Sequence, residues 1–181
     1  MAEILLSSEA FVKSVTSASD NLSGKYILPS LREAQEIGLR GILGDDLLAK
    51  LKDLIKNGTL ETESGGAYKI LVDHCQYYLA YMTSVEVTNK VSYKIGNFGV
   101  TKTSDENLQV ASQDEIAKMQ YYYQSKADAC CLDLQNFLLE HRKDYPELTE
   151  NGCHKIESNL QSAASCGIFL GGARGRILPR K

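Results

Sequence analysis

The sequence predicts an all-α protein: a small helical bundle with two long antiparallel helices, an inserted β-hairpin or extended arm at about residues 91–103, and an extended C-terminal tail. Three observations lead to this prediction. Apolar residues recur at helical spacing in four segments, whereas the alternation typical of a strand appears only after Val91. Residues that cap or stop helices bound these segments. The last fifteen residues combine glycines with scattered apolar and basic residues instead.

Composition limits the possible classes of protein. A chain of 181 residues is long enough to bury the core of one domain. Its net charge of −3 and pI near 5.7 argue against a general nucleic-acid-binding protein, which is normally basic. The tail, Gly167–Lys181, carries four basic residues and no acidic one, which leaves −7 for the rest by difference. We therefore separate a helical domain at 1–166 from a basic, glycine-rich tail at 167–181.

The chain shows no signal for secretion or membrane insertion. Ile4-Leu5-Leu6 is too short for the core of a signal peptide, and no run approaches the roughly 20 apolar residues of a membrane span. The odd number of cysteines does not have the spacing of a disulfide framework. Free thiols in a reducing cytosol are the simplest interpretation of Cys75, Cys130, Cys131, Cys153 and Cys166.

The pattern of apolar and capping residues in the N-terminal third of the chain predicts three short helices. Ser7 or Ser8 can cap the first, which runs through Val15. The second spans Ile27–Leu39, with Pro29 in its first turn, and its buried face comprises Leu31, Ala34, Ile37 and Gly38. A glycine elbow at Gly41 and Gly44 leads into the third, which begins at Asp45 and Asp46 as N-cap and favourable charge and stops at Asn57-Gly58.

Two long helices complete the bundle. The first is Ala67–Asn89, and a capping box at Ser112–Glu115 begins the second, which runs to about Arg142 before Tyr145-Pro146. Between them, Val91–Thr103 alternates as a strand does, with a turn at Gly96-Asn97. The expected core joins Leu31, Ile37, Leu47, Leu51, Leu71, Tyr78, Met119, Tyr123, Leu134 and Phe137.

Tyrosines are concentrated on the two long helices. Tyr121, Tyr122 and Tyr123 are consecutive, so on a helix they cannot all face one core. Some of the tyrosines must face solvent or a neighbouring chain, and tyrosine is favoured at interfaces. Partial burial in the core and a role in an interface are equally compatible with this pattern.

No motif for catalysis or for a cofactor emerges, so we expect a protein that is not an enzyme and needs no cofactor. Adjacent His–Cys pairs and the vicinal Cys130-Cys131 suggest zinc, but adjacent helical residues point about 100° apart and do not easily chelate one ion. No local signature of a cysteine nucleophile is present. The segment GGARGR lacks the ending of a nucleotide-binding loop and follows no predicted strand.

The tail has two interpretations. It is either a solvated terminus or a segment that docks on a partner, for which its apolar residues are an argument. In the second case the partner-binding residues are Ile168, Phe169, Leu170, Arg174, Arg176, Ile177, Leu178, Arg180 and Lys181.

Several motifs, taken in order, resemble head–tail connector (neck adaptor) proteins of tailed bacteriophages, most closely those of Bacteroidetes phages and prophages, including crAss-like phages. The resemblance begins with Ala34-Gln35 and Gly41-Ile42-Leu43-Gly44 and continues through the tyrosine-rich helix 68–89. It includes the arm at Ile95–Val100, the helix at 113–142, Tyr145-Pro146 and the terminal glycines with their arginines. It therefore covers nearly the whole chain.

The resemblance implies a structural virion protein without catalytic residues: one subunit of a ring, usually of twelve, between the portal and a downstream neck or tail protein. The subunit is then made in the cytoplasm of the bacterial host and lies in the virion neck. Double-stranded DNA passes through the lumen without sequence-specific binding, and an acidic body suits this because it repels phosphate. The tail docks on the portal, and the expected interface between subunits comprises Tyr93, Ile95, Phe98, Val100, Tyr121 and Tyr122.

Two alternatives to the connector remain open at this point. One is a monomeric helical module that binds another protein. The other is a packaging factor that binds nucleic acid through the arginines of its tail.

Overall fold

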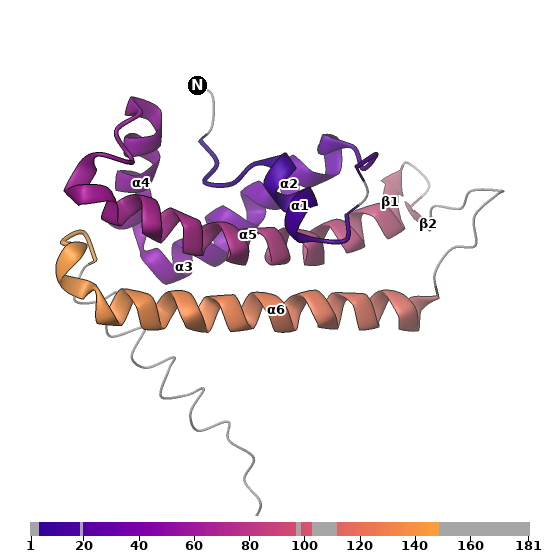
Figure 1. Ribbon diagram of the computed structural model, residues 1–181. Helices are drawn as coiled ribbons and strands as arrows, with labels where there is room; N and C mark the ends of the chain where they lie inside the picture. The colour runs from indigo at the N-terminus through magenta and orange to yellow at the C-terminus, as the bar shows by residue number, and fades with distance from the viewer. Residues whose placement is uncertain (1–3, 19, 97–98, 103–111, 149–181) are drawn as a thin grey trace, which may run out of the picture.

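The computed structural model describes residues 4–18, 20–96, 99–102 and 112–148, and the protein is mostly helical, which confirms the all-α class. Helix α5 (Ala67–Ser92) lies between two layers (Figure 1). On one side lies α6 (Gln113–Glu140); on the other lie α1 (Glu9–Val15) and α2 (Gly24–Glu33). In the described part of the chain, α6 packs extensively on α5 alone, so one edge of the molecule is a single helix.

Polar contacts at both ends show that α5 and α6 are antiparallel, as the sequence predicts. The Tyr145 hydroxyl, just beyond α6, donates to the carbonyl of Ala67 at the start of α5 over 3.0 Å. At the opposite end, the Gln120 amide contacts Asn89 near the end of α5. The predicted capping box is confirmed, since Ser112 and Glu115 bond reciprocally at the start of α6.

The predicted bounds of the shorter helices are largely confirmed. The Ser8 side chain caps α1 by accepting from the amide of Phe11 over 3.1 Å. Helix α4 (Asp45–Asn57) ends at Gly58, whose φ of +68° suits glycine. The N-cap of α4 is Gly44 rather than Asp45, which instead lies in the first turn. Two short 3₁₀ segments, Glu63–Gly66 and Arg142–Asp144, precede α5 and follow α6.

The second predicted helix differs from the prediction at both ends. It begins at Gly24, so Pro29 lies inside α2 rather than in its first turn. Beyond α2 the chain continues without a break through a π-helix at Ala34–Leu39 into α3 (Arg40–Leu43). The elbow therefore consists of Gly44 alone, with a φ of +81°, while Gly41 lies within α3.

The π-helix explains why the prediction for Ile37 is wrong. The Ile37 side chain is 78 % exposed, and Leu39 is fully buried instead. A π-helix makes i→i+5 bonds and so has more residues per turn than an α-helix. Residues after Ala34 therefore lie at different angles around the helix axis from those of a regular α-helix. The sequence prediction assumed the regular α-helical angles.

The remaining core residues follow the prediction closely, with one further exception. Leu31, Leu47, Leu51, Leu71, Tyr78, Tyr123 and Leu134 are buried, and Phe137 is half-buried against them. Met119 is exposed, which contradicts the prediction. It lies about 80° around the helix from Ala127, a fully buried residue that faces α5, and so at the edge of the packed face.

Two short strands extend from the end of α5: β1 (Tyr93–Gly96) and β2 (Gly99–Lys102). They pair antiparallel, with Tyr93 opposite Lys102 and Ile95 opposite Val100. Helix α5 runs three residues beyond the predicted Asn89, so Val91 is helical. None of the described helices combines the length and the apolar character needed to cross a membrane. The expectations for 149–166 and for the tail lie outside the described residues.

Candidate functional site

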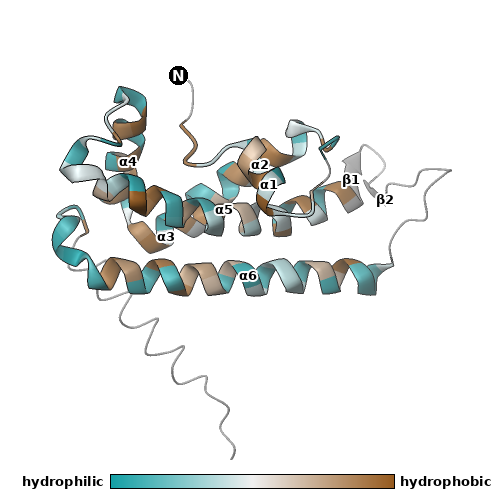
Figure 2. Cartoon of the chain, in the orientation of Figure 1, coloured by the Kyte–Doolittle hydropathy of each residue, from teal (hydrophilic) through white to brown (hydrophobic). Residues whose placement is uncertain are grey.

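Large apolar side chains lie exposed on α6. Tyr121 is 76 % exposed, Tyr122 is 55 % exposed and Leu132 is 42 % exposed, and Met119 is also exposed. Figure 2 shows apolar and polar residues interspersed around this helix rather than collected on one side. Because the face toward α5 is already filled, by Ala127 and Leu138 among others, these four side chains have no place in the core. Exposed large apolar groups gathered on one element are typical of a protein interface.

Aromatic rings of α5 and α6 take part in two edge-on contacts. Tyr77 of α5, also exposed, contacts Phe11 of α1 edge-on, with 5.4 Å between ring centroids. Tyr122 contacts the buried Tyr123 at the same separation. Burial raises the pKa of the Tyr81 hydroxyl on α5, and Cys130 and the neighbouring tyrosines add to the shift. The exposed Tyr77 and Tyr122 present an apolar ring with a polar tip, which suits protein contact.

The two described histidines, His74 and His141, have structural contacts. Nδ1 of His74 on α5 lies 2.9 Å from Oδ2 of Asp133 on α6. The His74 ring stacks on Phe137, which in turn stacks on His141, with centroids 4.4 Å apart in both pairs. Nδ1 of His141 bonds to the carbonyl of Phe137 over 3.0 Å. The contacts of His74 join α5 to α6, whereas those of His141 lie at the end of α6.

The described cysteines are not activated as nucleophiles. Burial raises the pKa of Cys75, which is completely enclosed, and also raises the pKa values of Cys130 and Cys131. A thiol of raised pKa stays protonated at neutral pH and is a poor nucleophile. No group of three or more His, Cys, Asp or Glu side chains among the described residues is placed to hold a metal ion. Cys153, His154 and Cys166 lie outside the described residues.

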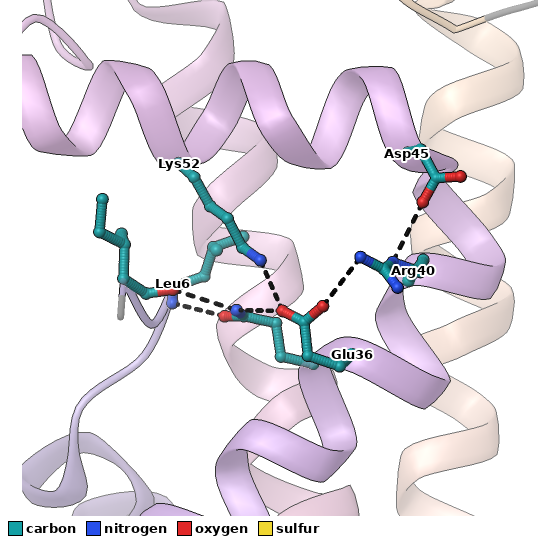
Figure 3. A network of polar contacts seen from close by, with 7 residues as sticks. Leu6, Glu36, Arg40, Asp45 and Lys52 are labelled. Carbon is teal, nitrogen blue, oxygen red and sulfur yellow. Dashed lines mark hydrogen bonds and ion pairs between the residues drawn. The ribbon is translucent and has the colours of Figure 1, made fainter. Parts of the chain in front are cut away.

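A polar network centred on the π-helix ties down the N-terminal segment (Figure 3). The fully buried Gln35 accepts from the amide of Leu6 over 2.9 Å and donates to the carbonyl of Ile4 over 3.1 Å. Gln76 of α5 donates to the carbonyl of Leu6 over 3.0 Å. Two side-chain amides thus hold residues 4–6 by their backbone. Sequence reasoning missed this clasp, because a glutamine in an amphipathic helix carries no signal for it.

The network continues along the π-helix through ion pairs. The Glu36 carboxylate contacts the Lys52 ammonium and lies 3.1 Å from Nη2 of Arg40, whose Nε lies 3.1 Å from Asp45 (Figure 3). The hydrogen bond from Lys52 is the main reason that the pKa of Glu36 is lowered. These contacts join the π-helix, α3 and α4. Each of the four charged side chains has a partner of opposite charge within the fold.

A cavity of about 110 Å³ lies at the junction of α1, α2, α5 and α6. Its lining is mostly apolar and includes Val12, Ile27, Val87 and Met119. The Tyr123 hydroxyl at its wall already accepts from the amide of Ser17 over 3.2 Å. The lining contains hydroxyl groups but no carboxylate, imidazole or amine, so it offers no general base for a reaction.

The structure places the predicted site residues only in part. Tyr121 and Tyr122 are exposed on α6, as an interface requires. Tyr93, Ile95 and Val100 belong to the paired strands, whereas Phe98 and the tail residues lie outside the described part of the chain. The sequence analysis did not identify Leu132 as an exposed residue. It lies eleven residues after Tyr121 on the same side of α6, opposite the buried Leu134, and this spacing could have revealed its exposure.

Comparison with known proteins adds one finding. No curated protein and no solved structure matches the chain. Residues 39–158, which include α4, α5 and α6, match the model of a family of unknown function, DUF6712. As this match covers about two thirds of the sequence, the chain belongs to the DUF6712 family.

Proposed function

We propose that this protein is a structural, non-catalytic subunit of a bacteriophage head–tail connector ring, which bridges the portal and the tail. The observation that carries the proposal is the one-sided packing of α6: a helix of 28 residues has one main partner in the described chain and presents Tyr121, Tyr122 and Leu132 to solvent. A helix of this kind suits a subunit that completes its packing against neighbours.

The elements have distinct roles in this proposal. The paired strands β1 and β2 stand at one end of the subunit and can meet a neighbouring chain by adding strands. The basic tail, Gly167–Lys181, docks on the portal, where its apolar residues fill pockets and its arginines pair with acidic groups. The charge of −7 on the rest of the chain keeps passing DNA from adhering to the lumen.

Deletion after Ser165 tests this proposal. The truncated protein should keep the helical circular dichroism of the full chain, because every described contact lies before Thr149. It should fail to join particles that contain the portal, whereas the full chain joins them in multiple copies. Incorporation of the truncated chain at the level of the full chain would refute the docking role of the tail.

The mass of the complex with the portal tests the ring itself. Many copies of this chain per portal support a connector ring. A single copy, or a protein that stays monomeric with every virion component, supports the monomeric binding module instead. Salt-dependent retention on DNA that is lost with the tail would favour a packaging factor.

A further inference from the structure

We infer that neighbouring copies of this chain contact each other through parallel α6 helices, with a residue on one flank of α6 facing the residue two positions later on the opposite flank of the next copy. The inference rests on the proposed ring and names the interface within it. The occupant of each flank is therefore a second copy of this chain.

Helical geometry sets the pairing. Successive residues of an α-helix are about 100° apart, so residues i and i+2 lie on nearly opposite sides. In a ring whose axis runs along α6, the α6 helices of all subunits are parallel and level with one another. One flank of each helix then meets the opposite flank of its neighbour, and such a head-to-tail contact closes when the rotation closes.

The position of α6 in the subunit permits this contact. It forms a layer of its own below α5, while the layer on the other side of α5 holds several helices (Figure 1). The edge of the subunit at α6 thus consists of one helix, whereas the layer on the other side of α5 consists of several. Subunits placed around an axis with this single-helix edge innermost can bring neighbouring α6 helices within the 8–10 Å typical of packed helices.

Three pairs of side chains on the two flanks are complementary at this offset of two residues. Exposed Met119 meets exposed Tyr121 of the next copy, and half-buried Phe137 meets half-buried Leu139. Lys126 meets Asp128, which carries the opposite charge, and both are exposed. The flank of Lys126 also holds Asp133, which already contacts His74 within the fold, so Lys126 and Asp128 are the charged pair on which the inference depends.

Lys126 and Asp128 carry charges that the described fold leaves without an ion pair. The Lys126 ammonium lies over the ring of Tyr122, 5.7 Å from its centroid. The Asp128 carboxylate accepts from the Gln124 amide over 2.8 Å. None of the ion pairs among the described residues includes either side chain, so both are available to a neighbour.

A two-fold dimer uses these flanks less well. A two-fold contact joins the same surface of both copies. It would bring the flank of Lys126 against itself, or the flank of Asp128 against itself, and would lose the pairing of Lys126 with Asp128. The offset of two residues therefore favours the head-to-tail contact of a ring.

Charge reversal tests the pairing. The measurements are the mass distribution of the purified full chain over a range of concentrations and its copy number in portal-containing particles. Lys126→Asp and Asp128→Lys should each weaken self-association by about tenfold or more, since each places like charges at every contact. The double variant exchanges the two charges and should restore association to near the wild-type level. Lys118→Asp, the same change on the face away from α5, is the control and should have little effect.

The outcomes separate the interface from the function. The interface would be overturned if both single variants associate as the wild type does, or if the double variant associates no better than either single variant. If the wild-type chain still joins particles in many copies, the proposed ring remains supported in either case. A wild-type chain that neither self-associates nor joins particles in many copies overturns both. Thermal unfolding checks that each variant folds, and Lys126→Gln with Asp128→Asn replaces any reversal that does not fold.

Discussion

The phenol oxygen of Tyr78 occupies the space beside the α-carbon of Gly38 that a β-carbon would need in any other residue. Gly38 lies in the π-helix and Tyr78 in the middle of α5, so this contact sets how closely the two elements approach. Tyr78 is buried, which limits how far its ring can move aside.

Gly38→Ala should therefore destabilise the protein by about 1–3 kcal/mol, because the new methyl group collides with the Tyr78 hydroxyl. Gly41→Ala is the matched control, since no atom lies within 4 Å of a β-carbon there and its backbone is helical; it should stabilise by about 0.5–1 kcal/mol. Urea unfolding measures both. Removing the hydroxyl with Tyr78→Phe should recover part of the loss, and equal effects of the two alanines would contradict this account.

Removing the Gln35 side chain should release the N-terminal segment. Gln35→Ala leaves the buried amide of Leu6 without its acceptor and should cost about 1–3 kcal/mol. Hydrogen exchange should accelerate at Leu6 more than in α5 or α6. Gln124→Ala, which removes an amide that bonds only a surface carboxylate, should change stability by no more than about 0.5 kcal/mol. Unchanged exchange at Leu6 would show that Gln35 does not hold this segment.

Alkaline pH should weaken the fold through its buried phenols, among them Tyr78 and Tyr145. Burial is the main reason that the pKa values of Tyr78 and Tyr145 rise to about 12, whereas tyrosine in an unfolded chain titrates near pH 10. Both phenols therefore contribute stability that is complete below about pH 10 and is lost as the pH rises toward about 12. Unfolding free energies measured from about pH 8 to about pH 11 should fall over the upper part of this range.

Tyr145→Phe should separate the two contributions of this residue. At neutral pH the substitution should cost about 0.5–1.5 kcal/mol, since the hydrogen bond to the Ala67 carbonyl is lost. Above about pH 10 the variant should lose less stability than the wild type, because one titrating group is gone. An equally steep decline in both proteins would show that Tyr145 does not contribute to the pH dependence.

Leu134 and Leu132 provide a matched test of which face of α6 is packed. Leu134 is fully buried against α5, so Leu134→Ala should cost about 2–5 kcal/mol. Leu132 lies two residues earlier, on the exposed side, and Leu132→Ala should change the unfolding free energy of the monomer by no more than about 0.5 kcal/mol. Comparable losses would mean that α6 is rotated about its axis relative to this structure.

Local chemistry made much of this fold predictable from sequence. The capping box at Ser112–Glu115, the Ser8 cap and the stop at Gly58 depend on backbone groups within a few residues, and all three are as predicted. Ile37 could not be placed correctly, because regular helical spacing does not reveal a π-helix. Met119 was misplaced for a different reason: only the width of α5, a tertiary property, decides how far around α6 burial extends.

The candidate site was predictable to a smaller extent. Three consecutive tyrosines cannot all be buried on one helix, and Tyr121 and Tyr122, which this argument led us to place at an interface, are exposed. It could not locate Leu132, Lys126 or Asp128, whose importance depends on which face of α6 meets α5. The clasp between Gln35 and Leu6 joins residues 29 positions apart, and local pattern does not report such a contact.

Because of the π-helix, the local structure depends on the exact number of residues between α2 and α3. The widened turn of the π-helix accommodates one residue more than an α-helix would, so deleting a single residue between Ala34 and Leu39 allows an unbroken α-helix from Gly24 to Leu43. Because the turn absorbs that extra residue, the regular helix would keep the apolar faces of α2 and α3 near their present relative rotation. Natural or engineered variants that lose one residue here should therefore keep both halves packed on α5, whereas the full-length sequence wound as a regular α-helix would turn one half by about 100° relative to the other.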